Sequence, residues 1–153
     1  AGNGGYDRRV PSMHLRAGVV AVVTDSQGRI MAFERSDLPG QWQLPQGGLD
    51  VGEEPRAAAW RELGEETGLG PEEVELVAEQ SRWTTYEWPV RVRNGGKRRG
   101  QVHRGFTFRV LDDAVEPTPD GFEFRSWRWV TAEWVIDNVV VFRRDSYTEV
   151  LGG

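Results

Sequence analysis

The chain has 153 residues, a common size for one domain with a buried core, and its 38% hydrophobic and 28% charged residues are ordinary globular composition. It contains no cysteine, which excludes disulfides and thiolate metal sites, and no run approaching the roughly 20 apolar residues of a membrane helix. The net charge of −5 argues against a protein that simply coats nucleic acid.

The N-terminal segment carries no signal-peptide pattern. Residues 1–12 are rich in glycine and lack an apolar core, so we expect a flexible tail followed by a single domain over residues 13–153. The lack of cysteine fits a reducing compartment. We therefore expect a cytoplasmic protein without membrane partners, either a monomer or a homodimer.

Charge is distributed unevenly along the chain. Acidic residues concentrate over residues 50–79. A basic block follows, made of Arg91, Arg93, Lys97, Arg98, Arg99 and Arg104. One interpretation is an acidic centre for cations beside a basic segment for phosphates; the other is two solvated faces of opposite sign.

The first predicted elements form a β-hairpin. Residues 17–24 are a continuous apolar run rich in valine, residues 25–28 supply a turn, and residues 29–34 alternate between apolar and polar side chains. Residues 38–48 contain prolines and glycines, which indicates a loop with short strand-like pieces.

Residues 54–67 predict a helix. Pro55 suits the first helical turn, and Gly68 ends the helix. The residues that share one inward face are Ala59, Trp60, Leu63 and Thr67.

The rest of the chain alternates strands and then becomes helical. Strands are predicted over residues 74–80, 81–92, 101–111 and 127–130, with a hairpin turn at Asn94-Gly95. The pattern is helical from Thr131 onward, and its inward candidates are Phe142, Tyr147, Val150 and Leu151. This order of elements indicates an α/β or α+β fold.

Carboxylates cluster on the predicted helix. Glu62, Glu65 and Glu66 lie at i, i+3 and i+4 and so share one face, and Glu53 stands just before the helix. Like charges at this spacing destabilise a helix by roughly 0.2–0.5 kcal/mol per pair. Hard divalent cations such as Mg²⁺ or Mn²⁺, which take oxygen ligands, would compensate for that cost. The alternative is a solvated helix face, because glutamate is a good helix former.

The surroundings of these glutamates favour the metal site. Gly47 is followed after five residues by Glu53, and after seven more by residues 61–69, which read RELGEETGL. This spacing fits every position of the Nudix box, and a chance match in this chain is on the order of 10⁻⁸ at a typical usage of about 6% per residue. The chain thus resembles the Nudix hydrolase superfamily.

That resemblance implies an α/β fold, an α/β/α sandwich whose mixed sheet carries a catalytic loop–helix–loop and a C-terminal helix. The implied cofactor is two or three Mg²⁺ or Mn²⁺ ions, with no other cofactor. In the implied site Arg61 holds neighbouring carboxylates in place by paired hydrogen bonds. The implied metal-binding set within the box is Glu53, Glu62, Glu65, Glu66 and the Gly47 backbone.

The segments that flank the box resemble a narrower group, the bacterial RNA 5′-pyrophosphohydrolases and diadenosine tetraphosphate hydrolases. Residues 42–48, WQLPQGG, are similar to the WQxPQGG run of that group, and residues 83–89, WTTYEWP, to its W-x-x-Y-x-x-P segment. Tyr86 lies seventeen positions after Leu69, a spacing associated with dinucleoside polyphosphate hydrolysis.

The C-terminal third continues the resemblance. Residues 123–130, EFRSWRWV, are similar to the group's E-F-x-x-W-R-W-V, whose glutamate is an extra metal ligand or general base; this implies the same for Glu123. Residues 141–147, VFRRDSY, are similar to its V-x-F-K-R-D-x-Y, whose phenylalanine stacks on a base. Phe142 is therefore a base-stacking candidate, with core packing as the alternative.

The resemblance also implies a substrate-binding set. Arg35 stands where the group has a phosphate-contacting arginine, Arg16 lies close to the place of another, and Lys97 is a further candidate for terminal phosphates. The full set is Arg16, Arg35, Gln46, Tyr86, Lys97, Phe142 and Arg143. The implied catalytic set is Arg61, Glu62, Glu65 and Glu123, in which Glu65 or Glu123 takes the proton of the attacking water.

The expected activity is cleavage of a diphosphate linkage in a nucleotide or at the 5′ phosphates of RNA. The favoured substrates are 5′-triphosphorylated RNA and dinucleoside polyphosphates, and the alternative enzyme is a house-cleaning pyrophosphatase for damaged nucleoside triphosphates. A different class is a Nudix domain that senses a nucleotide without catalysis. Degenerate boxes mark such sensors, and this box has all its acids.

Overall fold

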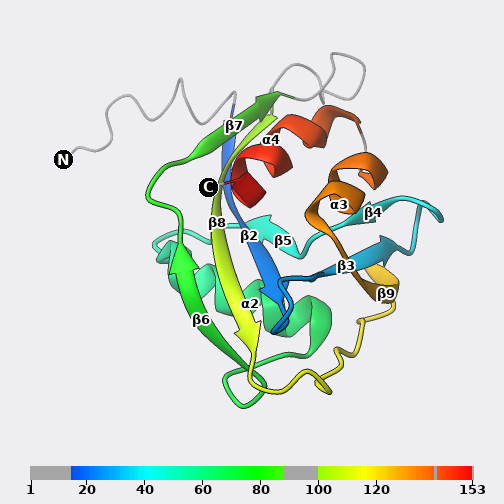
Figure 1. Ribbon diagram of the computed structural model, residues 1–153. Helices are drawn as coiled ribbons and strands as arrows, with labels where there is room; N and C mark the ends of the chain where they lie inside the picture. The colour runs from blue at the N-terminus through cyan, green and yellow to red at the C-terminus, as the bar shows by residue number, and fades with distance from the viewer. Residues whose placement is uncertain (1–14, 88–99, 140, 153) are drawn as a thin grey trace.

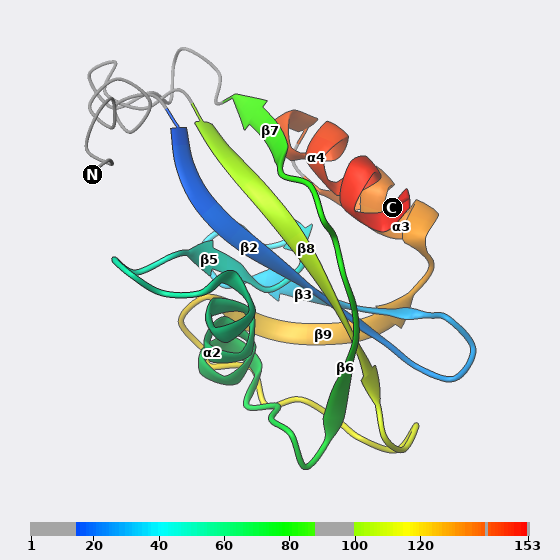
Figure 2. The ribbon, with the colours of Figure 1, turned by 90° about the vertical axis from the view of Figure 1, so that its left-hand side faces the viewer.

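The computed structural model describes residues 15–87, 100–139 and 141–152, apart from the side chains of residues 15, 16, 86, 87, 100, 101 and 141–146. A mixed β-sheet lies between helix α2 (Pro55–Thr67) on one face and helices α3 (Ala132–Asn138) and α4 (Val141–Gly152) on the other (Figures 1 and 2). The predicted α/β/α sandwich is confirmed. No helix in the described ranges is long and apolar enough to cross a membrane.

The sheet has eight strands within the described residues, and its main path runs β4–β3–β2–β8–β6. In addition, β5 pairs with β2, β7 with β8, and β9 with β3. The strands are β2 (Leu15–Thr24), β3 (Ile30–Arg35), β4 (Trp42–Gln43), β5 (Gln46–Gly48), β6 (Val74–Glu79), β7 (Thr84–Glu87), β8 (Gly100–Val110) and β9 (Phe124–Val130).

The central strand β2 is buried on both faces. Val19 and Val23 belong to the core cluster beneath α2, whereas Val20 and Val22 belong to the cluster beneath α3 and α4. A strand covered on both sides needs apolar residues at consecutive positions, which explains its unbroken valine-rich run. Its long partner is β8, paired in parallel from Leu15↔Gly100 to Thr24↔Arg109.

The predicted N-terminal hairpin is only partly correct. The turn and both strands form, and Gly28 adopts the left-handed φ of 78°. However, β2 and β3 pair at Thr24↔Ile30 and then separate, because β3 continues along β9 from Ile30↔Val130 onward. The side of β2 that the hairpin would have used is taken by β5.

Helix α2 begins and ends where the sequence predicts. Pro55 occupies its first turn, and Gly68 ends it with a left-handed φ of 75° while its N–H donates to the Gly64 carbonyl. Trp60 packs edge-to-face on Phe108 at 4.8 Å between ring centroids. The buried residues of the helix are Ala58, Ala59, Glu62, Leu63, Glu66 and Thr67. Two of these are glutamates, which the predicted apolar face did not include.

The C-terminal layer consists of two helices. Tyr147 and Val150 on α4 are buried and Leu151 is half-buried, as predicted, whereas the side chain of Phe142 lies outside the description. Strand β9 starts three residues earlier than the predicted 127–130. Of the predicted strand 81–92, residues 81–87 are described; β7 begins only at Thr84, and residues 81–83 are not a strand. The Asn94-Gly95 turn lies outside the described residues.

Candidate active site

Strand β5 brings the glycines of the box against helix α2. Gly47 pairs with Val19 and Gly48 with Gly18 on β2, which leaves no room for a side chain at Gly47. A Cβ atom on Gly47 would lie 2.1 Å from the carboxyl group of Glu62. A side chain at position 47 would therefore displace the Glu62 carboxyl group, because the backbone of β5 passes directly over it.

Arg61 gathers the acidic residues of the box around its guanidinium group. Its Nε and Nη2 donate to the two oxygens of Glu53 at 2.8 Å each, and its Nη1 donates to Glu62 at 2.9 Å and to Glu65 at 3.3 Å. Nη2 also donates to the Gly48 carbonyl at 3.0 Å. Arg61 thus ties the loop before α2 to the helix itself, which is the structural pairing expected for it.

Glu53 is an anchor for this arrangement. It receives both hydrogen bonds from Arg61, and its Oε1 also accepts from the Asp50 backbone N–H at 2.9 Å. These hydrogen bonds lower the pKa of Glu53 to about 2, and the same carboxylate raises the pKa of Arg61. Both groups are charged at neutral pH, so the pair is a fixed scaffold beside the site.

Glu62 and Glu66 form a buried carboxyl pair, exposing only 9% and 7% of their surfaces. Burial is the main cause that raises the pKa of each; the adjacent Glu62 raises the pKa of Glu66 further, to about 9. The side chains share a hydrogen bond, and Glu66 also accepts from the Gln46 backbone N–H at 3.2 Å. Two buried carboxyl groups this close repel each other when both are charged, and the Arg61 guanidinium, which donates to Glu62, offsets part of that cost.

Glu65 and Glu123 flank this pair from the solvent side. The Glu65 side chain is 60% exposed and bonded to Arg61, and Glu123 is exposed at the start of β9. The Glu123 charge contributes to the raised pKa of Glu66, so Glu123 faces the same group of carboxylates. The four predicted metal ligands therefore come from two elements, α2 and the segment before β9.

The segment before β9 is fixed by backbone contacts on both sides. Asp120 N–H donates to the carbonyl of Glu66 at 3.2 Å, which ties the segment to α2. Ser36 N–H donates to the carbonyl of Glu123 at 2.9 Å, which ties it to the end of β3. Glu123 is held between helix and sheet although its side chain is exposed.

Two predicted substrate-binding residues have described side chains. Arg35, at the end of β3, donates to Asp37 through Nε at 3.0 Å and Nη2 at 2.8 Å. Gln46 is half-buried, and its amide oxygen accepts a hydrogen bond from the Tyr147 hydroxyl on α4. Arg35 lies next to Glu123 through the β3–β9 pairing, whereas the Gln46 side chain points toward the opposite layer.

The remaining predicted binding residues are placed by backbone only or not at all. Arg16 on β2 and Tyr86 on β7 both pair with Gln101 of β8, so the three form one row across the sheet. The backbones of Phe142 and Arg143 lie in the first turn of α4, and Lys97 lies outside the described residues. Their predicted contacts stay predictions.

The donor chemistry fits a hard divalent cation. Glu62, Glu65, Glu66 and Glu123 offer only oxygen atoms, the ligands that Mg²⁺ and Mn²⁺ take. In the part of the chain that the structure describes, no three such groups already stand at metal-binding distances. Instead, Arg61 binds Glu62 and Glu65, and Glu62 shares a hydrogen bond with Glu66. If Glu62 and Glu66 are both to be anions, that shared hydrogen bond is lost and a positive charge must compensate for their repulsion.

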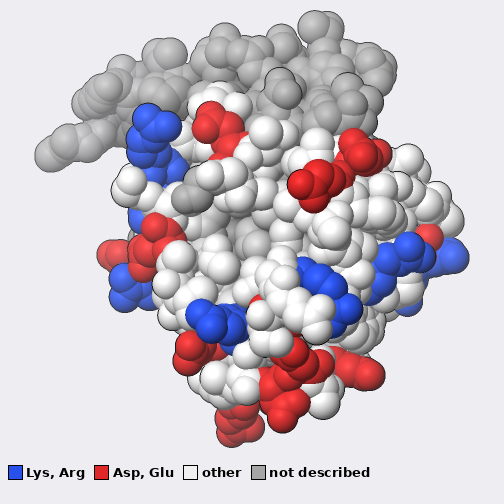
Figure 3. Space-filling model, in the orientation of Figure 1, with Lys and Arg blue, Asp and Glu red and all other residues white. Residues whose placement is uncertain are grey.

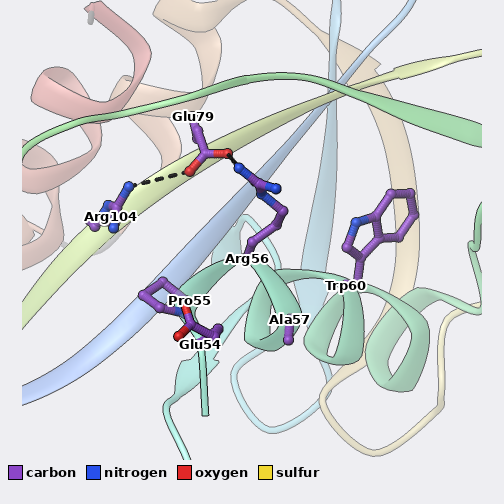
Figure 4. A pocket seen from close by; sticks show the side chains of 7 residues that line it. All are labelled: Glu54, Pro55, Arg56, Ala57, Trp60, Glu79 and Arg104. Carbon is purple, nitrogen blue, oxygen red and sulfur yellow. Dashed lines mark hydrogen bonds and ion pairs between the residues drawn. The ribbon is translucent and has the colours of Figure 1, made fainter.

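A surface hollow of about 490 Å³ lies on the other flank of α2, away from this group (Figure 4). Glu79 lies between Arg56 and Arg104 there, with ion pairs of 2.6 and 3.3 Å. Arg104 is a member of the basic block with a described side chain, and it is engaged in this network. Figure 3 shows basic and acidic side chains interspersed on the face turned to the viewer, with acidic groups gathered at the lower end of the molecule.

Three residues of the site were not predicted from the sequence. Asp120 collects backbone N–H groups in the Glu123 segment, Tyr147 binds Gln46, and Asp50 lies 3.7 Å from Arg61. The Asp120-Gly121 pair is a turn pattern that could have indicated a fixed segment ahead of Glu123. Nothing in the sequence indicates the partner of Tyr147, because 101 residues separate it from Gln46.

Comparison with known proteins agrees with this geometry. The NUDIX domain family matches residues 14–150. An RNA pyrophosphohydrolase of Cereibacter sphaeroides is 45% identical over 146 residues, covering 92% of this chain and 90% of the relative. One from Roseobacter denitrificans is 40% identical over 148 residues, covering 93% and 92%.

Solved structures share the fold at lower identity. The E. coli dihydroneopterin triphosphate pyrophosphohydrolase aligns with a TM-score of 0.72 at 19% identity, covering 92% of this chain and 99% of that one. Enzymes of the matched family generally use divalent metal ions and hydrolyse phosphoric anhydrides. The chain therefore belongs to the Nudix hydrolase family, as the residues of its box predicted.

Proposed function

We propose that this Nudix pyrophosphohydrolase removes phosphates from the 5′ end of triphosphorylated RNA. The observation that carries the chemistry is the buried Glu62–Glu66 pair beneath Gly47, with Glu65 and Glu123 beside it. The RNA substrate is supported by relatives named RNA pyrophosphohydrolase, which match along nearly the whole chain at up to 45% identity.

The residues proposed to hold two or three Mg²⁺ or Mn²⁺ ions are Glu62, Glu65, Glu66 and Glu123, with the Gly47 backbone alongside. Bound divalent ions neutralise phosphate charge and lower the pKa of water. Glu53 remains with Arg61, because its pKa of about 2 keeps it in that ion pair. We assign Glu53 an auxiliary role, in which it fixes the guanidinium that orients Glu62 and Glu65.

The proposed reaction is an in-line displacement at phosphorus. The water oxygen forms a bond to phosphorus, the phosphoanhydride P–O bond breaks, and the leaving group departs as pyrophosphate or phosphate. Glu65 or Glu123 takes the proton of the water, and both are solvent-accessible carboxylates beside the buried pair. Arg35 is proposed to exchange Asp37 for a terminal phosphate, because a guanidinium binds either group through paired hydrogen bonds.

Hydrolysis of dinucleoside polyphosphates is the second candidate. Tyr86 lies seventeen residues after Leu69, the spacing associated with that activity, and pairs through the backbone with Gln101 in the same row as Arg16.

We keep Arg16, Gln46, Tyr86, Lys97, Phe142 and Arg143 as proposed substrate contacts. A cytoplasmic location, a monomer or homodimer, and a domain over residues 13–153 also remain our proposals.

Product analysis tests the substrate. The enzyme is offered 5′-triphosphorylated RNA and diadenosine tetraphosphate in parallel, each with Mg²⁺ and with Mn²⁺, and Glu65→Gln serves as the catalytic control. Faster release of pyrophosphate or phosphate from RNA supports the proposal, and preferred formation of ATP and AMP replaces it with the second candidate. Activity on neither substrate, or full activity of Glu65→Gln, would overturn the assignment.

A further inference from the structure

An exposed aromatic residue directly precedes Glu123 of the proposed site in the chain. Phe122, the residue before Glu123, exposes 88% of its surface. Phenylalanine is usually buried, because its ring is among the largest apolar groups that folding removes from water. Single exposed apolar residues are nevertheless common, so exposure by itself assigns no role. Two further observations point to a role: the hydrogen bonds that hold the backbone of Phe122, and its place next to Glu123.

The backbone around Phe122 is held in one conformation by Asp120. The Asp120 Oδ1 atom accepts three backbone N–H groups, from Phe122 at 3.0 Å, Glu123 at 2.9 Å and Phe124 at 3.1 Å. Gly121 turns the chain with a left-handed φ of 84°, which side chains rarely adopt. Three donors on one carboxylate oxygen fix the residue that carries the ring.

The same segment is tied to both walls of the site. Ser36 donates through its N–H to the Glu123 carbonyl at 2.9 Å and through its hydroxyl to the Gly121 carbonyl at 3.3 Å. On the other side, Asp120 N–H donates to the Glu66 carbonyl at 3.2 Å. Figure 2 shows this segment passing alongside α2 before β9 begins. The backbone of Phe122 is therefore held in place one residue before Glu123.

The other exposed aromatic ring among the described side chains differs in its surroundings. Trp83, 41% exposed, lies 5.7 Å from the guanidinium of Arg104 and lines a separate hollow with Glu79 and Glu149. Within the described part of the chain, no ring or guanidinium contact involves Phe122. Its face is available to a flat group from outside the protein, and a substrate whose phosphates were held by divalent ions at Glu66 and Glu123 would bring such a group.

We propose that Phe122 is a stacking platform for a nucleobase of the substrate. Every base has a π-face, so stacking on one ring tolerates sequence variation and is worth about 1–3 kcal/mol per base, a factor of about 5 to 150 in affinity. Because binding of the 5′ phosphates would set the position of the chain, the ring would meet the base of one particular nucleotide. Substrates that carry a base at that position would bind more tightly. This inference rests on the proposed action at RNA 5′ ends.

The test is a double-mutant cycle, in which the ring of Phe122 and one base of the RNA are removed singly and together. KM and kcat are measured for the wild type and Phe122→Ala with short 5′-triphosphorylated RNAs, either complete or lacking the base at nucleotide 1, 2 or 3. Phe122→Tyr keeps a stacking ring, and Phe122→Leu keeps only apolar bulk. Leu111→Ala removes an apolar side chain that is 55% exposed at the end of β8, away from the site, and is the matched control.

The inference predicts that Phe122→Ala raises KM for complete RNA by about 5- to 150-fold with kcat little changed. Removing one particular base should raise the KM of the wild type by the same factor, and it should leave the KM of Phe122→Ala almost unchanged. Phe122→Tyr should restore KM, whereas Phe122→Leu should not, and Leu111→Ala should match the wild type. Equal losses for all abasic RNAs in both proteins, or full rescue by leucine, would overturn the stacking role.

Failure of the proposed function would be visible in the wild type alone. If the wild type hydrolyses diadenosine tetraphosphate but not RNA, the same cycle is run with diadenosine tetraphosphate against adenosine 5′-tetraphosphate, which lacks the second base. A loss specific to the second base then supports Phe122, and a loss independent of it overturns the inference. A wild type inactive on both substrates would overturn the proposed function and this inference together.

Discussion

Glu62 and Glu66 lie one helical turn apart on the buried face of α2 and share a hydrogen bond between their side chains. They take up space that apolar residues fill elsewhere on this face, next to Leu63 and Ala59. Burying acids in the core costs stability; Arg61 compensates Glu62, whereas Glu66 keeps a pKa raised to about 9, so folding alone does not explain Glu66. The predictions below follow from this arrangement.

Replacing Glu66 by glutamine should stabilise the metal-free protein. The amide keeps a donor toward Glu62 and removes a buried acid, so we expect a gain of about 0.5–2 kcal/mol in the free energy of unfolding at pH 8. Thermal denaturation measures this with a chelator and then with Mg²⁺. The wild type should gain stability from Mg²⁺, and Glu66→Gln should gain little. A destabilised variant that still responds to Mg²⁺ would contradict the metal role of Glu66.

Adding a methyl group at Gly47 should disable the site. The new Cβ would meet the Glu62 carboxyl group at 2.1 Å, so β5 and the carboxylate must move apart. A displacement of this kind near the reacting groups can lower kcat by about 100-fold. Gly64→Ala on the same helix is the control, because its Cβ meets only the Leu69 carbonyl at 3.8 Å. That control should keep its activity and gain about 0.5–1 kcal/mol in stability.

Arg61→Lys should lower activity although it keeps the charge. Lysine cannot reproduce the planar fork that binds Glu53 with two nitrogens while it also reaches Glu62 and Glu65. We expect kcat or metal affinity to fall by about 10- to 100-fold, as for other residues that orient metal ligands. The matched control is Arg56→Lys, since Arg56 pairs with Glu79 on the exposed flank of the same helix. Equal activity of both variants would show that Arg61 acts by charge alone.

Asp25 should make the fold sensitive to acid. Burial raises its pKa, but hydrogen bonds from Arg29 and Gln27 outweigh this and leave the pKa below the ordinary 3.8. Because the folded-state pKa is the lower one, its contribution is complete above pH 3.8 and is lost as the pH falls toward the folded-state value. The stability difference between wild type and Asp25→Asn, about 1–3 kcal/mol at pH 7, should shrink below about pH 4. A difference that is constant from pH 2 to pH 7 would contradict this.

Asp120 should act on catalysis through the position of Glu123. Asp120→Ala removes the acceptor of three N–H groups, so we expect kcat to fall by about 10- to 100-fold with a smaller change in KM. Asp120→Asn retains the amide oxygen that can accept the same hydrogen bonds, and it should restore most of the activity. Steady-state kinetics of both variants decides between positioning and charge. Loss in both alike would indicate that the negative charge itself is needed.

Local sequence features predicted much of this fold. Helix α2 was predicted within one residue, because Pro55 and Gly68 act on the backbone where they stand. The separation of β2 from β3 was not predicted, because it depends on β9, in which Val130, the partner of Ile30, lies 100 positions away along the chain. Turn residues specify the turn, but they do not specify which strands continue beside it.

The candidate site was predicted to a similar extent. The spacing of Glu62, Glu65 and Glu66 was enough to predict that they share one helix face, and all three lie on α2. Their unequal burial was not evident, because it depends on β5 covering two of them and leaving Glu65 exposed. Phe122 and Asp120 were missed for the same reason, since the exposure of a ring and the hydrogen bonds of a loop arise only in the folded chain.

The most direct test of the account is pyrophosphate and phosphate release from 5′-triphosphorylated RNA in single-turnover experiments over a range of Mg²⁺ concentrations. The wild type and Glu66→Gln are compared, with stability measured on the same samples. The account predicts Mg²⁺-dependent release by the wild type and a loss of at least about 100-fold in Glu66→Gln, although that variant stays folded. Release that is independent of Mg²⁺, or equal in the two proteins, would contradict the central claim that the buried carboxyl pair is the catalytic metal site.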